Sequence, residues 1–329
     1  MFDLIANTAS DIYVFSQSTV YEWLVQPLAF DLGLGGLMED GYEVSGWLVI
    51  GMFQIIVIAL LFAPLERLRP VEKVIYSRAV YTDMIYTVIH RLGFFRLFFF
   101  FSVAPFLDNA FGWLHTKGFS PVQLEDLVPG VTDIGWVSFI LYLVVFDFLG
   151  YWIHRAQHQW GWWWTLHSVH HSQRQMTIWS DSRNHLLDDV IHAILFSLIA
   201  LFIGIEPSQY VGIVCLTQLA ESFQHANIKL SFGRLGERLW VSPRFHRIHH
   251  SVGVGHEFRQ GVLGGHNFAI LLPIWDLLFR TSLFENRYDP TGIRDQVEND
   301  VDYGDGFLSQ QWLGLIRFSK AIITKFSPA

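Results

Sequence analysis

The sequence predicts an all-α integral membrane protein, a bundle of about three spanning helices plus a helical hairpin, with a histidine-rich cap on the cytoplasmic side. Three observations indicate this class. Hydrophobic residues make up 51% of the 329 residues and charged residues only 16%, whereas about a quarter of residues carry charge in soluble domains. The apolar residues gather in runs long enough to cross a bilayer. Near the ends of these runs, eight histidines fall into three short clusters.

The first expected span is the uncharged run of seventeen residues at 46–62, close to the about 20 residues that cross the hydrocarbon core. Every charged residue before this run is acidic, and the first basic residue of the chain, Arg67, follows it. Because cytoplasmic loops carry the excess of Lys and Arg, we expect the N-terminus outside. A second span is expected at about 84–106 and a third at 136–153, joined by an acidic external loop at 107–135.

Two further apolar runs, 191–205 and 210–223, are separated by Glu206-Pro-Ser-Gln, which is a turn signal. We interpret them as a helical hairpin that enters and leaves on the same side. The run at 268–279 has only twelve residues, so an interfacial or re-entrant segment is expected there. The polar tail that follows contains one amphipathic stretch, at 308–323.

The histidine clusters have helical spacing. Residues three or four apart share one face of a helix, so each cluster aims its imidazoles at one region, and imidazole is the commonest metal ligand among side chains. His225 follows the predicted hairpin and lies beside the clusters on this topology. The predicted metal ligands are His154, His158, His167, His170, His171, His225, His246, His249 and His250.

This many ligands overfills one first-row ion and suits two. Nitrogen-only donors argue against magnesium and calcium, which take oxygen ligands, and leave iron, zinc, copper or nickel. Two irons beside an apolar cavity indicate dioxygen activation and attack on an aliphatic C–H bond, whereas zinc indicates hydrolysis or a structural role. The single Cys215 excludes disulfides and cysteine-ligated clusters. The net charge of −8, without a long basic tract, gives no reason to expect nucleic acid.

Carboxylates are expected to orient the metal-bound imidazoles. Asp147 lies seven residues before His154 on the same predicted helical face, and Glu221 lies four before His225, so each is predicted to bond a ligand histidine. His185 precedes the hairpin and is a candidate ligand or supporting residue. Weaker supporting candidates are Asp188, Asp189 and Asp276, and His192, His256 and His266 are expected to be structural or supporting.

These motifs and their framing residues resemble the fatty acid hydroxylase / sterol desaturase superfamily. The resemblance runs from about residue 136 to residue 281, and Arg183-Asn-His185 is similar to an element of its bacterial and alkylglycerol branches. The motifs that carry it are Asp147-Phe-Leu-Gly-Tyr-Trp-Ile-His154-Arg-x-x-His158, His167-x-x-His170-His171, Gln224-His225-Ala-Asn227, Ser242-Pro-x-x-His246-x-x-His249-His250, Asn267-Phe-Ala, Trp275-Asp276 and Phe279-Arg-Thr281.

The resemblance implies a non-haem di-iron centre, at a site that zinc can also occupy. It implies a lipid substrate of the sterol, fatty acyl, alkylglycerol or carotenoid class, which the protein oxidises. It implies a lipid hydroxylase or monooxygenase in the membrane, with a separate electron donor such as a reductase, a ferredoxin or a cytochrome b5-like protein. The expected organisation is an N-terminal membrane region at 1–135, a catalytic region at 136–281 and a cytoplasmic tail at 282–329, in one integrated domain. The expected site is bacterial inner membrane or endoplasmic reticulum, with the active site on the cytoplasmic side.

Two alternatives stay open. A desaturase of the same family begins with the same hydrogen abstraction and ends in an alkene. A non-catalytic zinc or haem protein is the alternative of another class, although two axial histidines per haem leave most of these residues unexplained.

Overall fold

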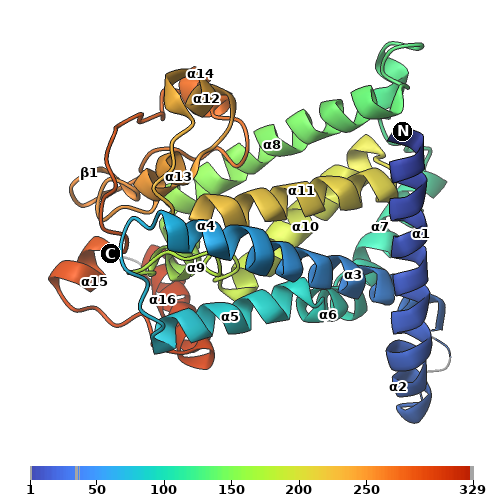
Figure 1. The fold of residues 1–329 in the computed structure, drawn as a ribbon, viewed down its shortest axis with the longest axis horizontal. Coiled ribbons are helices and arrows are strands. Elements are labelled where there is room, and N and C mark those ends of the chain that lie inside the picture. The colour runs from blue at the N-terminus through green and yellow to red at the C-terminus, as the bar shows by residue number, and fades with distance from the viewer. Residues whose placement is uncertain (1, 34–35, 37, 327–329) are drawn as a thin grey trace.

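The computed structural model describes residues 2–33, 36 and 38–326 of the chain. Long helices run side by side through the body, short helices and loops form a cap at one end, and α1 stands across the other end (Figure 1). The helices are α1 (Phe2–Val20), α2 (Gln26–Asp31), α3 (Met38–Val57), α4 (Ala63–Leu68), α5 (Arg78–Arg91), α6 (Phe94–Ser102), α7 (Ala104–Thr116), α8 (Gly135–Gln159), α9 (Gly161–His171), α10 (Leu186–Ile203), α11 (Pro207–His225), α12 (Gly233–Leu239), α13 (Pro243–His249), α14 (Ile274–Leu278), α15 (Arg294–Glu298) and α16 (Phe307–Phe326).

Three helices of the described part are long and apolar enough to cross a membrane. They are Gly41–Leu68, which joins α3 to α4 through a π-helical turn, then α8, and then α10. The expected runs at 46–62 and 136–153 are therefore confirmed as long apolar helices. The expected hairpin also forms, from α10 and α11. Gly204, at φ 60°, ends α10 in the left-handed conformation, and Pro207 begins α11, because glycine adopts positive φ without strain and proline suits a first helical turn.

The single second span expected at 84–106 is wrong. The chain there forms three helices, α5, α6 and α7. Gly93, at φ 80°, separates α5 from α6, and Pro105 lies in the first turn of α7. A left-handed glycine interrupts the helical hydrogen bonds, so an apolar sequence is broken into short segments.

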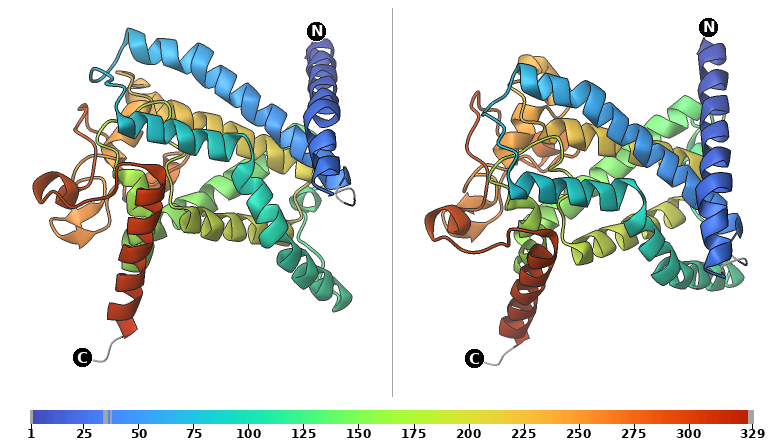
Figure 2. Two further views of the ribbon diagram at one scale, coloured as in Figure 1. Left: turned by 90° about the horizontal axis from the view of Figure 1, so that it is seen from below. Right: turned by 60° about the horizontal axis from the view of Figure 1, so that its bottom comes forward.

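Three further elements lie at the cap end. The amphipathic tail is confirmed as helix α16, which packs against α9 and then extends away from the body (Figure 2). A short antiparallel pair, β1 (Glu257–Arg259) with β2 (Val262–Leu263), departs from the all-α expectation. The run at 268–279 is mostly irregular chain within the cap and ends in the short helix α14.

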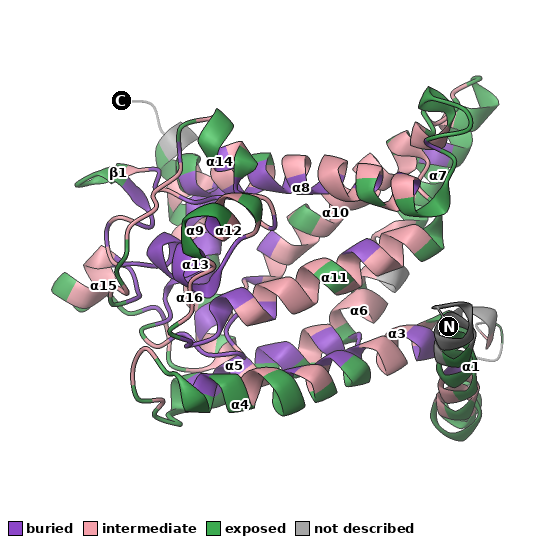
Figure 3. Cartoon of the chain, turned by 45° about the horizontal axis from the view of Figure 1, so that its top comes forward, coloured by how far each residue is buried: buried purple, intermediate pink, exposed green. Residues whose placement is uncertain are grey.

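The cap is fixed to the bundle by buried polar and apolar contacts. The Glu66 carboxylate at the end of the first long helix accepts backbone N–H groups from Ile178, at 3.0 Å, and Asn227, at 2.9 Å. Ile58, Ile178 and Ile228 pack together beside it. Buried residues are concentrated around α9 and α13, whereas the long helices show mainly intermediate and exposed residues (Figure 3). Among the described residues, burial is therefore greatest around the histidine-bearing segments.

Candidate metal centre

Four helices bring all nine predicted ligands together at the cap end of the bundle. Each of the nine side chains is buried. Local capping places the last cluster, because the Ser242 hydroxyl accepts the N–H of Phe245 and Pro243 begins α13. The histidines come from α8 (His154, His158), α9 (His167, His170, His171), the last residue of α11 (His225), and α13 with the residue after it (His246, His249, His250).

The nine histidines form two adjoining groups, and in each group one ligand nitrogen per residue lies within 4.8 Å of the others. Rings from the two groups touch, since His171 stacks on His250 with centroids 4.3 Å apart. The first group contains His154, His158, His167, His171 and His249, and the second contains His170, His225, His246 and His250. Each group could therefore hold a metal ion.

The convergent nitrogens fit a metal. In the second group, three Nε2–Nε2 separations are 3.0–3.2 Å. Histidine nitrogens bind first-row ions at about 2.0–2.1 Å, which places neighbouring donors about 3 Å apart. In the first group, the buried Nε2 atoms of His158, His167 and His249 have no hydrogen-bond partner in the described part of the chain. Buried polar atoms are rarely left unpaired, so these atoms indicate a missing positive partner.

The other ring nitrogen, Nδ1, is held in place for six of the nine histidines. Five of these contacts go to backbone carbonyl oxygens, and the sixth joins His167 to the Asp188 carboxylate at 3.2 Å. A histidine whose Nδ1–H donates a hydrogen bond keeps the Nε2 lone pair for a metal. The carbonyl partners are Phe268 for His154 (2.8 Å), Gly264 for His158 (3.2 Å), Arg183 for His170 (3.2 Å), Glu221 for His225 (2.8 Å) and His266 for His249 (2.8 Å).

Three of these carbonyls belong to one loop, at residues 264–268. Asn267 adopts φ 62°, and its side-chain amide donates to Phe245 O at 3.0 Å and to Leu283 O at 3.1 Å. The Asp276 carboxylate accepts the N–H groups of Phe268, at 2.9 Å, and Ala269, at 2.8 Å. Asp276 and Asn267 thus fix the loop whose oxygens orient the imidazoles.

Asp147 and Glu221 do not make the predicted contacts to histidine. Asp147 instead accepts Leu271 N, at 2.8 Å, and Trp275 Nε1, also at 2.8 Å, so it supports the same loop from α8. His225 is bonded by the backbone carbonyl of Glu221 and not by its carboxylate. In a helix, the carbonyl oxygen of one residue lies next to the residue four positions later, so the Glu221 carbonyl is within reach of the His225 ring.

His185 lies outside both ligand groups. Its Nε2 bonds the carbonyl of Gln311 in α16 at 2.9 Å, and its Nδ1 accepts Leu187 N at 3.1 Å, as the N-cap of α10. Gly314 of α16 packs so closely that a Cβ atom there would lie 2.4 Å from His185 Cδ2. His185 therefore docks α16 against the start of α10.

Burial favours the neutral form of five of these histidines. It lowers the pKa of His170, His171, His246 and His250 well below the usual 6.5, and the neighbouring imidazoles lower it further. Burial also lowers the pKa of His249, to about 3. Neutral imidazole is the form that binds metals, so these side chains are ready to bind an ion at neutral pH.

A cavity of about 470 Å³ leads from the histidines between the long helices. This volume lies within the about 300–1,000 Å³ of ordinary ligand pockets. Its wall includes His154, His167 and His170 at one end and apolar side chains such as Leu143 and Ile213 farther along. An alkyl chain bound in this cavity would end beside the histidine nitrogens.

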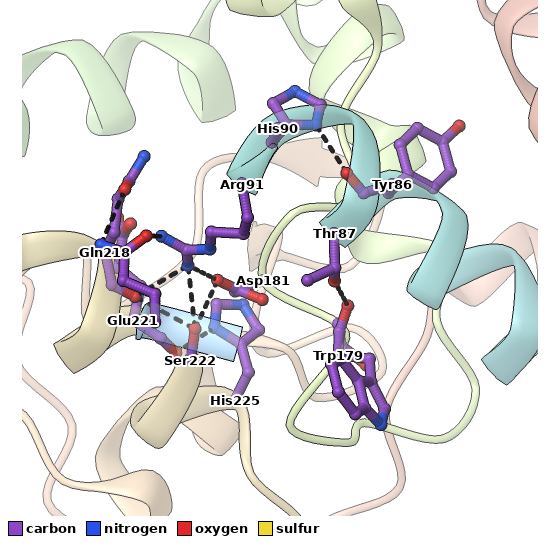
Figure 4. Close-up of polar contacts among 12 residues, drawn as sticks. Tyr86, Thr87, His90, Arg91, Trp179, Asp181, Gln218, Glu221, Ser222 and His225 are labelled. Carbon is purple, nitrogen blue, oxygen red and sulfur yellow. Dashed lines mark hydrogen bonds and ion pairs between the residues drawn. The ribbon is translucent and has the colours of Figure 1, made fainter. Parts of the chain in front are cut away.

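One polar network beside the cavity was not predicted. Arg91 of α5 donates to Asp181 at 2.5 Å, to Ser222 at 2.9 Å and to Gln54 at 3.1 Å (Figure 4). It joins α3, α5 and α11 with the loop before α10, close to His225. An arginine inside the apolar stretch at 84–106 was the available sequence signal, since buried charges in membranes require partners.

Comparisons with known proteins agree with this site. Residues 139–281 match the fatty acid hydroxylase family. Human alkylglycerol monooxygenase is 31% identical over 47% of this chain and 32% of its own length. An ornithine lipid hydroxylase of Rhizobium tropici is 28% identical over 52% of this chain and 48% of its own length. A Delta(7)-sterol 5(6)-desaturase of Gibberella zeae is 26% identical over 38% of this chain and 39% of its own length.

The predicted resemblance to the fatty acid hydroxylase / sterol desaturase superfamily is thus confirmed over this region. The chain spans about a third to a half of the length of these curated relatives. Their names are all those of oxidoreductases. No solved structure matches the chain.

Proposed function

We propose that this protein is a membrane-bound di-iron oxygenase that hydroxylates a C–H bond of a lipid. The observation that carries the proposal is the pair of buried histidine groups at the end of an apolar cavity. Three apolar helices long enough to cross a membrane support a substrate that enters from the bilayer. The relatives support the reaction class, because their names are monooxygenase, hydroxylase and desaturase.

The nine histidines would hold two ions, one in each group. Iron supplies the redox chemistry that activates dioxygen, which zinc lacks. The protein's own contribution is to hold the imidazoles in orientation through Asp188 and the 264–268 loop. The walls of the cavity exclude water and align the lipid chain with the ligand nitrogens. Reducing equivalents come from a separate donor protein or a small reductant.

The proposal includes a topology, with the N-terminus outside and the histidines at the cytoplasmic face. It is supported by the acidic residues before the first long helix and the basic residues that follow it. In the structure, α1 and the cap lie at opposite ends of the bundle (Figure 1).

Desaturation is the second candidate, favoured by the sterol desaturase relative. We favour hydroxylation because hydroxylases and monooxygenases are the names of the first relatives. The alternative of a non-catalytic zinc or haem protein gives the cavity beside the histidines no role.

The test incubates membranes that contain the protein with ¹⁸O₂, a reductant and candidate lipids. Label in an alcohol of the lipid is the expected result. An alkene without label identifies a desaturase. Conversion that continues without oxygen contradicts the proposal.

A further inference from the structure

The cavity changes character along its length. On α11, Glu221 and Gln218 line the cavity within two turns of His225, whereas Ile213 and Val214 line it farther away. At 1.5 Å per helical residue, Ile213 lies about 18 Å along the axis from His225. On α8, Leu143 and Phe146 likewise line the part remote from His154. The section beside the histidines is therefore mostly polar, whereas the remote section is mostly apolar and includes the charged side chain of Arg96.

Within that polar section, Glu221 is the carboxylate with both oxygens open. Among the described residues, its side chain accepts no hydrogen bond and forms no ion pair, whereas each of the other carboxylates there has at least one oxygen bonded, although the buried Oδ1 of Asp181 is unpaired. Their partners are Leu271, Leu272 and Trp275 for Asp147, Arg91 and Ser222 for Asp181, His167, Gln157 and Trp163 for Asp188, and His90 for Asp189.

The nearby cation does not neutralise Glu221 by contact. Arg91 directs its guanidinium to Gln54, Asp181 and Ser222, and to the carbonyl of Gln218 (Figure 4). A carboxylate that lines an enclosed cavity without a donor leaves hydrogen-bonding capacity unused, which is costly unless something binds there. The missing partner must bring N–H or O–H groups.

We propose that Glu221 binds the hydrogen-bond-donating head group of the lipid substrate, either hydroxyl or ammonium. This inference rests on the proposed function and specifies its substrate class. The alkyl chain extends from the head along the apolar section, so the oxidised carbon lies within a few bonds of the head group. A carboxylate or phosphate head does not fit this end, because an ionised Glu221 repels it and offers it no hydrogen-bond donor.

The opposite orientation makes a different prediction. Arg96 lines the far section of the cavity and stacks on Trp47, with its guanidinium carbon 3.6 Å from the ring centroid. Among the described residues it has no carboxylate partner. If the head group were anionic and lay at Arg96, the carbons beside the histidines would be those far from the head.

The experiment compares 1-O-hexadecylglycerol, which has a neutral diol head, with hexadecanoic acid, which has an anionic head. Purified protein in lipid nanodiscs is assayed for binding by tryptophan fluorescence, for turnover under ¹⁸O₂, and for the position of the label by mass spectrometry. The variants are Glu221→Gln, Glu221→Leu, Arg96→Leu and, as a matched control on the exposed end of α11, Glu206→Gln.

For the wild type, we expect tighter binding of the alkylglycerol and label within a few bonds of its head. Glu221→Leu should weaken alkylglycerol binding and raise KM by at least about tenfold, the effect of losing a hydrogen bond to a charged group, with metal content unchanged. Glu221→Gln keeps an acceptor and should restore much of the binding of a hydroxyl head. Glu206→Gln should leave alkylglycerol binding unchanged, and Arg96→Leu should leave the position of the label unchanged.

Three results overturn the inference. They are label far from the head together with sensitivity to Arg96→Leu, equal binding of both lipids, and loss of metal in Glu221→Leu, which would make Glu221 a ligand. If no lipid acquires label while alkylglycerol binding still depends on Glu221, the proposed reaction fails and the head-group site stands.

Discussion

Removal of the Asp188 carboxylate should weaken both the fold and the first metal group. Its two oxygens accept hydrogen bonds from Gln157 Nε2, at 2.9 Å, and Trp163 Nε1, at 2.6 Å, and contact His167 Nδ1 at 3.2 Å. Each buried donor left without an acceptor costs about 1–3 kcal/mol. Asp188→Ala leaves the N–H donors of Gln157 and Trp163 without an acceptor, so we expect a loss of about 2–6 kcal/mol in the free energy of unfolding.

The effect on metal follows from His167, which loses the group that fixes its ring. Removal of such a partner lowers metal affinity by about 10–100-fold, and the loss should be confined to one of two bound ions. The assay titrates a chelator against purified protein and measures retained metal, with thermal unfolding in parallel. Asp305→Ala, at an exposed ion pair with Arg78, is the control and should change neither. Equal retention of both ions in Asp188→Ala and wild type would refute this account of Asp188.

Three further predictions concern ligands, pH and topology. The double variant His170→Ala/His249→Ala removes one histidine from each group, so it should retain less than half of the metal and lose activity. His115, an exposed residue of α7 outside both groups, is the control, and His115→Ala should match wild type. Full metal occupancy in the double variant contradicts the ligand assignment. Because burial lowers the pKa of five buried histidines below the unfolded 6.5, the unfolded chain binds more protons below that pH; the five are His170, His171, His246, His249 and His250. The metal-free protein should therefore lose stability as the pH falls from about 7 to 5, and a flat melting temperature over this range refutes the assignment. A cysteine introduced at Arg174, which is exposed in the loop between α9 and α10, should resist an impermeant external reagent, and labelling from outside would reverse the proposed topology.

The clustering of the histidines was predictable because it is a local property. Spacings of three and four residues put His167, His170 and His171 on one helical turn without any knowledge of the fold. The same applies to the long uncharged run at 46–62, whose length alone indicates a spanning helix. In both cases the sequence pattern and the structure concern the same stretch of chain.

The orienting contacts were not predictable in the same way. Asp147 bonds Leu271, which is 124 residues away, and the carbonyls that hold His154, His158 and His249 belong to a loop shaped by Asn267 at positive φ. Sequence spacing instead favoured partners on the same helix, which produced the incorrect contacts for Asp147 and Glu221. The break at Gly93 was missed for a related reason, since hydropathy does not register backbone conformation.

The central claim is that the nine histidines hold two iron ions at the inner end of the cavity. The most direct measurement is an anomalous difference map, recorded at the iron absorption edge from crystals of protein produced with iron. The account predicts two peaks, one among His154, His158, His167, His171 and His249 and the other among His170, His225, His246 and His250. A single peak shared by all nine residues, or peaks outside them, would contradict it.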